Sequence, residues 1–224
     1  SQRIVTVTPP ARDGHAMAYD ALRGEVVLFG GSADSGRLAD TWVWNGSTWT
    51  QSAVVVAPTA RVGHALAYDA RRGEVVLYGG DSNSVSLADT WVWNGSTWTQ
   101  RIVTVPPPVR SSHSMAYDAV RGEVVLFGGR SSSTFRSDTW AWNGTGWTQR
   151  SVSVLPPGRA NHAVAYDALR GELVLFGGWS YSNSEGFTDV WAWNSASWNK
   201  GPRRLAQPAR DGHAMAYDAQ RGEV

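Results

Sequence analysis

Five histidines recur at one position of a repeated phrase, and each follows an arginine by three residues. Successive histidines are 49, 49, 49 and 51 residues apart. Histidine is the commonest protein ligand for transition metals, so metal binding is the first chemistry to consider. Because each histidine has the same place in its own repeat, we instead expect them to be structural parts of the repeating unit, and we predict no metal or cofactor. These residues are His15, His64, His113, His162 and His213.

Paired carboxylates also recur in every complete repeat. General acid–base catalysis needs one such pair in an environment of its own, and a pair present in every unit does not have one. The repetition favours structural use, with hydrogen bonds at strand starts and pairing to turn arginines at Arg23, Arg72, Arg121 and Arg170. We therefore predict a protein that is not an enzyme. The carboxylates are Asp40, Asp89, Asp138 and Asp189, with Glu25, Glu74, Glu123 and Glu172.

Composition narrows the classes of partner. The formal net charge of the 224 residues is +1, so no electrostatic footprint for nucleic acid is visible. No apolar run approaches the roughly 20 residues of a membrane-spanning helix, and we predict no membrane insertion. The sequence has no cysteine, which excludes disulfides, thiolate metal ligands and a cysteine nucleophile within it.

Twelve of the thirteen tryptophans stand at fixed positions of the repeat. Large aromatic side chains at such positions favour packing between repeats, and we expect their indole N–H groups to find backbone partners. The exception is Trp179, which opens a variable loop. The repeated tryptophans are Trp42, Trp44, Trp49, Trp91, Trp93, Trp98, Trp140, Trp142, Trp147, Trp191, Trp193 and Trp198.

One repeat can be interpreted as four short antiparallel strands. In the first, 15–19 alternates small and large side chains, 20–24 has turn chemistry, and 25–29 is apolar on both faces. A polar loop leads to a third strand at 40–44, and Asn45-Gly46 predicts a hairpin into a fourth. No helical periodicity is present, so the predicted fold is all-β.

A sheet that is apolar on both faces must be covered on both sides. Radial stacking of such sheets, as in a β-propeller, achieves this and leaves only short edges. The predicted four-stranded blades are 11–59, 60–108, 109–157 and 158–208, followed by a partial fifth repeat at 209–224. Residues 2–7 match residues 100–105, which predicts that a preceding unit ends there.

Three motifs of each repeat together resemble kelch repeats and are similar to kelch arrays of secreted bacterial proteins. In the first repeat they are His-Ala-Met-Ala-Tyr-Asp, Val-Val-Leu-Phe-Gly-Gly and Asp-Thr-Trp-Val-Trp-Asn-Gly. The resemblance covers nearly the whole chain and implies an extracellular bacterial location. Kelch rings close with five to eight blades, so four and a part imply further blades or chains that complete one another. Galactose oxidase resembles this fold, but its copper chemistry requires a cysteine, which this sequence lacks.

Recognition is expected where the repeats differ, because loops on a rigid scaffold carry binding residues. The loop after each Gly-Gly varies, and the fourth is two residues longer. The connectors between repeats have strong β character, and we expect them to extend the outer strand and to form an apolar rim. The candidate interaction residues are Arg130, Phe135, Trp179, Tyr181 and Phe187.

Three functions remain open at this point. The first is a non-catalytic binding or scaffolding propeller that mediates protein interaction. The second is an extracellular structural protein that self-assembles into rings or fibres through open blade edges. The third is a carbohydrate-binding propeller.

Overall fold

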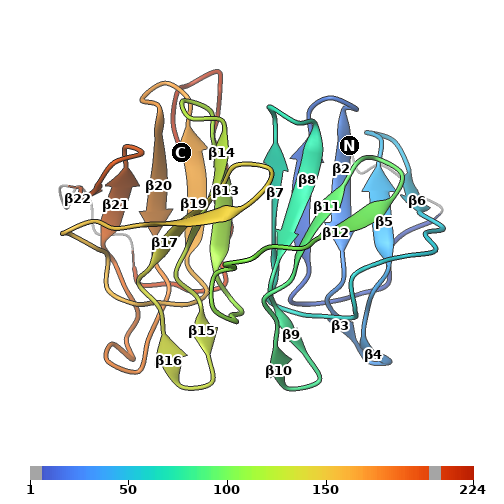
Figure 1. Cartoon of the computed structure of the whole chain (residues 1–224), viewed down its shortest axis with the longest axis horizontal. Coiled ribbons are helices and arrows are strands. Elements are labelled where there is room, and N and C mark those ends of the chain that lie inside the picture. The colour runs from blue at the N-terminus through green and yellow to red at the C-terminus, as the bar shows by residue number, and fades with distance from the viewer. Residues whose placement is uncertain (1–6, 202–207) are drawn as a thin grey trace. The chain divides into compact units, whose positions relative to one another are not determined.

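The computed structural model describes residues 7–201 and 208–224, and these residues form strands and turns with no helix. Four four-stranded antiparallel sheets account for most of the strands (Figure 1). This confirms the predicted fold class, an all-β propeller of four-stranded antiparallel blades. The predicted end of a preceding unit at residues 2–7 lies, apart from Val7, outside the described residues.

Each sheet falls inside one predicted repeat and has its strands in chain order. Blade 1 consists of β1 (Ala16–Asp20), β2 (Glu25–Phe29), β5 (Thr41–Trp44) and β6 (Trp49–Gln51). Blade 2 consists of β7 (Ala65–Asp69), β8 (Glu74–Tyr78), β11 (Thr90–Trp93) and β12 (Trp98–Arg101). Blade 3 consists of β13 (Ser114–Asp118), β14 (Glu123–Phe127), β17 (Thr139–Trp142) and β18 (Trp147–Arg150). Blade 4 consists of β19 (Ala163–Asp167), β20 (Glu172–Phe176), β21 (Val190–Trp193) and β22 (Trp198–Lys200).

Three of the variable loops fold into two-stranded hairpins that the sequence did not predict. Each strand of these hairpins has two residues, and an alternation of polar and apolar side chains cannot be recognised over so short a segment. The hairpins are β3 (Ser32–Ala33) with β4 (Gly36–Arg37), β9 (Asp81–Ser82) with β10 (Val85–Ser86), and β15 (Arg130–Ser131) with β16 (Thr134–Phe135). The longer fourth loop has only the isolated bridges Ala160–Trp179 and Ser180–Asn183 at this place.

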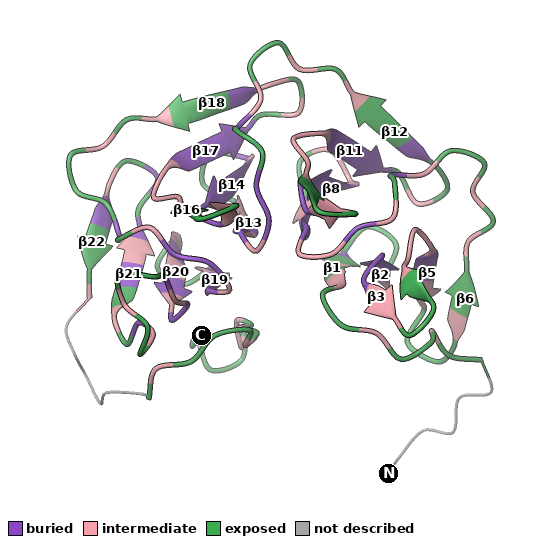
Figure 2. Cartoon of the chain, turned by 90° about the horizontal axis from the view of Figure 1, so that it is seen from below, coloured by how far each residue is buried: buried purple, intermediate pink, exposed green. Residues whose placement is uncertain are grey.

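The chain divides into two compact units, residues 1–111 with blades 1 and 2, and residues 112–224 with blades 3 and 4. Residues 208–224 belong to the second unit and contain no strand, only the isolated bridge Asp218–Glu223. The second strands β8 and β14 are largely buried, whereas the outer strands β12 and β18 each have a buried tryptophan followed by two exposed residues (Figure 2).

Side-chain hydrogen bonds fix the turn between the first two strands. The Asp20 carboxylate accepts the amides of Leu22 and Arg23 at 3.1 and 3.2 Å, and Gly24 donates to the Asp20 carbonyl at 2.9 Å. Gly24 has a φ of 70°, which glycine adopts without steric cost. The predicted turn at 20–24 is therefore present, and β1 and β2 pair in the register that places Ala18 opposite Val27.

The predicted hairpin at Asn45-Gly46 forms. Its loop has four residues, 45–48, since Trp44 and Trp49 are the last pair of the two strands. The Asn45 side-chain oxygen accepts the amides of Ser47 and Thr48 at 3.0 and 2.9 Å. These bonds make an asparagine turn in place of the two-residue turn that Asn-Gly most often signals.

Within the first unit, the two blades pack by unlike faces. Blade 2 presents what we call the aromatic face: Leu66, Tyr68, Val75, Leu77, Trp91, Trp93 and Trp98. Blade 1 presents the small face: Ala16, Ala18, Val27, Phe29, Thr41 and Val43. Alternation along each strand places these two sets on opposite faces of every blade. A large-to-small fit of this kind fills the space between sheets at close-packed density.

The second unit repeats this packing. The aromatic face of blade 4, with Leu173, Leu175, Trp191, Trp193 and Trp198, contacts Val125 and Phe127 of blade 3. The same indole–hydroxyl hydrogen bond is present at both junctions. Trp98 donates its indole N–H to the Thr41 hydroxyl at 2.9 Å, and Trp198 donates to Thr139 at 2.8 Å.

Glycine pairs allow the backbones of neighbouring repeats to approach. Gly31 has a φ of 100°, and its amide donates to the Arg61 carbonyl of the next repeat at 2.9 Å. A Cβ on Gly30 would lie 2.9 Å from the Arg61 carbonyl oxygen of the next repeat, and one on Gly31 would lie 2.7 Å from the Asp13 carbonyl oxygen of its own repeat, both closer than real Cβ atoms approach. The Gly-Gly pairs are therefore required by the junction as well as by the turn.

Two expectations about the outer edge and the indoles were wrong. The connectors do not extend the outer strands: β12 ends at Arg101, and the following Ile102 is 88% exposed outside any strand. Six indole N–H groups bond to side chains rather than to the backbone, those of Trp42, Trp91, Trp98, Trp140, Trp191 and Trp198. Trp91, for example, donates to the Asp89 carboxylate at 2.7 Å.

Candidate functional site

In blades 1, 2 and 4, the arginine three residues before the histidine forms a buried, bidentate ion pair with an aspartate. Arg61 donates to both carboxylate oxygens of Asp89 at 2.7 Å and to the Gly79 carbonyl at 2.8 Å, and its side chain is fully buried. Arg12 with Asp40 and Arg159 with Asp189 repeat this geometry in their own blades. The pair ties the start of each repeat to its third strand.

Burial alone would raise the pKa of Asp89, but the hydrogen bonds and charge of Arg61, helped by the indole of Trp91, hold that pKa below its usual value. The predicted pairing of these aspartates with turn arginines was therefore wrong. Arg23 and Arg72 instead pair with the turn residues Asp20 and Asp69, both at 2.6 Å. The missed signal was the recurring spacing from arginine to aspartate, 28 residues in blades 1 and 2 and 30 in blade 4, which is too long for local rules to connect.

His64, His162 and His213 each contact the phenylalanine of the preceding repeat. His64 is buried, and its Nε2 lies 3.1 Å from the Phe29 carbonyl oxygen of the preceding blade. Burial, together with the positive charge of Arg61, lowers the pKa of His64 to about 3, and His162 is lowered to about 3 for the same reasons. The ring is therefore neutral, with Nε2–H donating to the carbonyl. His113 is likewise buried, while His15 and His213 are half-buried.

Among residues 7–201 and 208–224, no group of three or more His, Cys, Asp or Glu side chains could hold a metal ion.

The repeated tryptophans lie on the aromatic faces of their blades: Trp42, Trp44, Trp91, Trp93, Trp140, Trp142, Trp191 and Trp193 on third strands, with Trp49, Trp98, Trp147 and Trp198 on fourth strands. Side chains at these positions pack the blades together, so we expect ligand-binding residues in the variable loops.

In the second unit, three aromatic rings from variable loops of neighbouring blades meet. Phe135, on β16 of the blade 3 loop, contacts Trp179 and Tyr181 of the blade 4 loop with ring centroids 5.0 and 5.1 Å apart. The Trp179 and Tyr181 centroids are 5.6 Å apart, and all three contacts are edge-to-face. Tyr181 is 65% exposed and the other two rings are half-buried. We call these three residues the aromatic cluster.

The two remaining candidate residues have different surroundings. Arg130 pairs with Phe135 across the β15–β16 hairpin, so both side chains project from the same side of it. Phe187 is only 8% exposed, and the Arg159 guanidinium lies 3.8 Å from its ring centroid. Phe187 thus covers a buried arginine and does not reach the surface, contrary to its selection as a contact residue.

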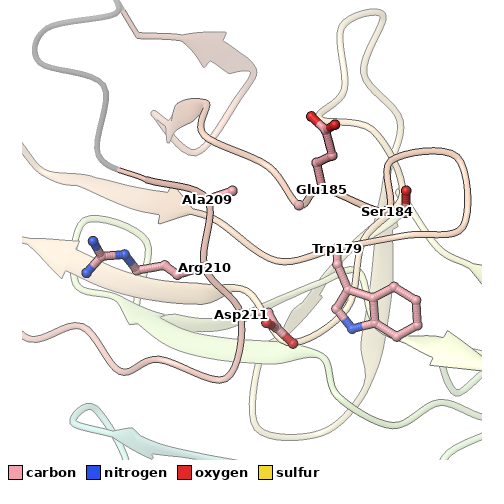
Figure 3. A pocket seen from close by; sticks show the side chains of 7 residues that line it. Trp179, Ser184, Glu185, Ala209, Arg210 and Asp211 are labelled. Carbon is pink, nitrogen blue, oxygen red and sulfur yellow. The ribbon is translucent and has the colours of Figure 1, made fainter.

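A pocket of about 230 Å³ opens beside Trp179. Figure 3 shows that its lining comes from two segments, the blade 4 loop and residues 209–211. The lining residues are Trp179, Ser184, Glu185, Gly186, Ala209, Arg210 and Asp211. They offer one aromatic face, two carboxylates and one guanidinium, which is a set suited to stacking and hydrogen bonding with a polar ligand. Sequence reasoning missed the contribution of residues 209–211, which are remote from the loop along the chain.

No family model matches this chain, and no curated protein matches it. Its class rests on the sheets themselves, which are those of a β-propeller. The described part of the chain contains no helix long and apolar enough to cross a membrane.

Proposed function

We propose that this chain is a kelch-type β-propeller that binds a protein partner through the aromatic cluster and catalyses no reaction. The observation that carries the proposal is the gathering of Phe135, Trp179 and Tyr181 from two loops that differ between repeats. Partly exposed aromatic rings in mutual contact are typical anchors of protein interfaces. The resemblance of the repeat sequences to kelch repeats further supports a binding role and a secreted, extracellular location.

Site-specific photo-crosslinking tests this proposal. A photoreactive phenylalanine derivative replaces Tyr181 in one variant and Val85, at the tip of the corresponding blade 2 hairpin, in another. The two positions are similarly exposed, at 65% and 62%, so they differ in surroundings rather than in access. We expect a discrete extracellular protein of the source organism to be captured at position 181 only, and to be lost when Trp179→Ala is added.

Capture of the same proteins at both positions would show that the blade 4 loop has no special role. The proposal would also fail if Trp179→Ala left the capture at position 181 unchanged. Phe187→Leu serves as the matched aromatic control, because this ring lies beneath the surface and its loss should leave capture intact.

Carbohydrate binding is the second candidate function, favoured by the pocket. An indole beside carboxylates and a guanidinium can stack on a sugar ring and bond its hydroxyls. Binding on a glycan array that Trp179→Ala and Asp211→Ala both abolish would support this function. An array with no bound glycan would remove it.

A further inference from the structure

The last described segment of the chain is a near-copy of the first strand region. Residues 208–224 read as residues 10–26 with a single difference, Gln220 in place of Leu22. The segment 10–26 includes β1, its turn and the start of β2, all parts of blade 1.

Residues 208–224 bind the small face of blade 4 as the start of a following blade would. Gly178 donates its amide to the Arg210 carbonyl at 2.9 Å, and Gly212 donates to Asn161 at 2.9 Å. The ring of His213 lies 5.5 Å from that of Phe176. In the first unit, blade 2 makes the same contacts with blade 1: Gly31 to Arg61, Gly63 to Gly14, and His64 against Phe29, at the same three distances.

This occupation covers the blade 4 face only in part. Val190, on the third strand, is 37% exposed, whereas Thr41, Thr90 and Thr139 at the corresponding positions are buried. Arg210 is exposed, whereas Arg61 and Arg159 are fully buried. Residues 208–224 carry the counterparts of the first strand of a blade and contain no tryptophan, so they cover less of this face than a whole blade does.

Blade 1 has the opposite property, since its first strand is exposed on the aromatic face. Met17 and Tyr19 are 53% and 58% exposed, whereas the corresponding Leu66 of blade 2 is 7% exposed. Trp49 is half-buried, whereas the corresponding Trp98 is 3% exposed and bonded to the neighbouring blade.

We propose that blade 1 of a second copy of this chain displaces residues 208–224 from the small face of blade 4, which joins the two copies head to tail. Every contact that the segment makes is available to residues 10–26, since the two segments differ only at one position. That position lies away from blade 4: the Leu22 side chain approaches Gly73 of the next blade, and its amide donates to the Tyr68 hydroxyl. The incoming blade adds Trp44 and Trp49 over Val190.

The exchange preserves the pocket beside Trp179. Arg210 and Asp211 leave with the displaced segment, and Arg12 and Asp13 of the second copy have the same places in the repeat. Arg12 is already paired with Asp40 within its own blade. In the joined copies, the pocket beside Trp179 therefore takes its arginine and one of its aspartates from the second copy.

Two features limit the strength of this association. The displaced segment is tethered to blade 4, so the second copy competes against a local concentration on the order of millimolar. Blade 4 also has Val190 where the other blades have threonine, so the Trp49 indole finds no hydroxyl acceptor there. Association is thus concentration-dependent, and Val190→Thr should tighten it about tenfold by restoring the hydrogen bond.

Sedimentation velocity of the full chain, from micromolar to near-millimolar concentration, tests the proposal. Identical substitutions at equivalent positions should act in opposite directions. Met17→Ser with Tyr19→Ser weakens association because it damages the incoming blade, whereas Met215→Ser with Tyr217→Ser strengthens it because it loosens the tethered segment. If the substitutions acted only by removing apolar surface, both variants would associate more weakly than the wild-type chain. That result would overturn the proposal. Circular dichroism confirms that each variant is folded.

A mixing experiment tests the head-to-tail arrangement. Val190→Lys removes the acceptor face and the Met17/Tyr19 double variant removes the donor face, so each alone should remain monomeric. Their mixture retains one intact donor and one intact acceptor and should form a dimer that grows no further. A mixture that stays monomeric, or a wild-type chain and Val190→Thr variant that stay monomeric throughout, would overturn the proposal.

Discussion

The buried histidines make the stability of each unit sensitive to mild acid. The pKa of His64 and His162 is about 3 in the folded chain and near 6.5 once the chain unfolds. A group whose folded pKa is lowered stabilises the fold above its unfolded pKa and loses that contribution as pH falls toward its folded pKa. The contribution of these histidines is therefore complete above about pH 6.5 and is lost progressively below it.

The magnitude follows from the width of this window. At about pH 5, the unfolded chain binds a proton at each of these histidines that the folded chain excludes, which costs about 2 kcal/mol per histidine. His64 lies in the first unit and His162 in the second, so each unit loses about this amount. The lowered pKa values of Asp40, Asp89 and Asp189 act only in stronger acid, since those carboxyls titrate below their usual 3.8.

Urea unfolding followed by tryptophan fluorescence at about pH 7 and about pH 5 measures the effect. His64→Gln keeps an N–H donor for the Phe29 carbonyl but does not titrate, so it should remove about 2 kcal/mol of the pH dependence of the first unit. His15→Gln, at a half-buried ring, is the matched control with a smaller expected effect. The reasoning is refuted if His64→Gln remains as acid-sensitive as the wild-type chain.

Three further predictions concern the repeated contacts. Trp98→Phe and Thr41→Val should each destabilise the first unit, and a double-mutant cycle should yield a coupling of about 1 kcal/mol from their hydrogen bond; additive effects would argue against the bond. Asp89→Asn leaves the fully buried Arg61 guanidinium with a neutral partner and should cost about 3 kcal/mol in urea unfolding, and a change near zero would show that solvent reaches the pair. Gly31→Ala should cost more than about 2 kcal/mol because its Cβ would meet backbone at 2.7 Å, whereas Gly146→Ala, with nothing nearby, should change stability by less than about 0.5 kcal/mol; equal effects would contradict the close approach.

The strands were predictable from the sequence because their signals are local. Alternation in residues 25–29, the aspartate turn at 20–24 and the apolar third strand each appear within a few residues of chain. Repetition then allowed one interpreted unit to be extended to four. The propeller class followed from one physical requirement, that a sheet apolar on both faces be covered on both sides.

The polar pairings were not predictable because they join residues far apart in the chain. Arg61 and Asp89 are separated by 28 residues, and the Trp98 indole bonds to Thr41 of another blade across 57 residues. Local rules instead favoured pairing of the repeated carboxylates with the turn arginines. The aromatic cluster was predicted residue by residue, but the proximity of Phe135 to Trp179 depends on how neighbouring blades stack.

Hydrogen exchange at the amides of Gly31 and Gly63 tests the central claim that neighbouring repeats dock face to face. Both amides lie outside the strands, and their hydrogen bonds, to Arg61 and Gly14, connect one repeat with the next. If the blades are docked, these amides are protected to within about tenfold of the core amide of Val76, since exchange requires the blades to separate. Exchange of both amides at the rate of the exposed connector residue Val55 would contradict the account.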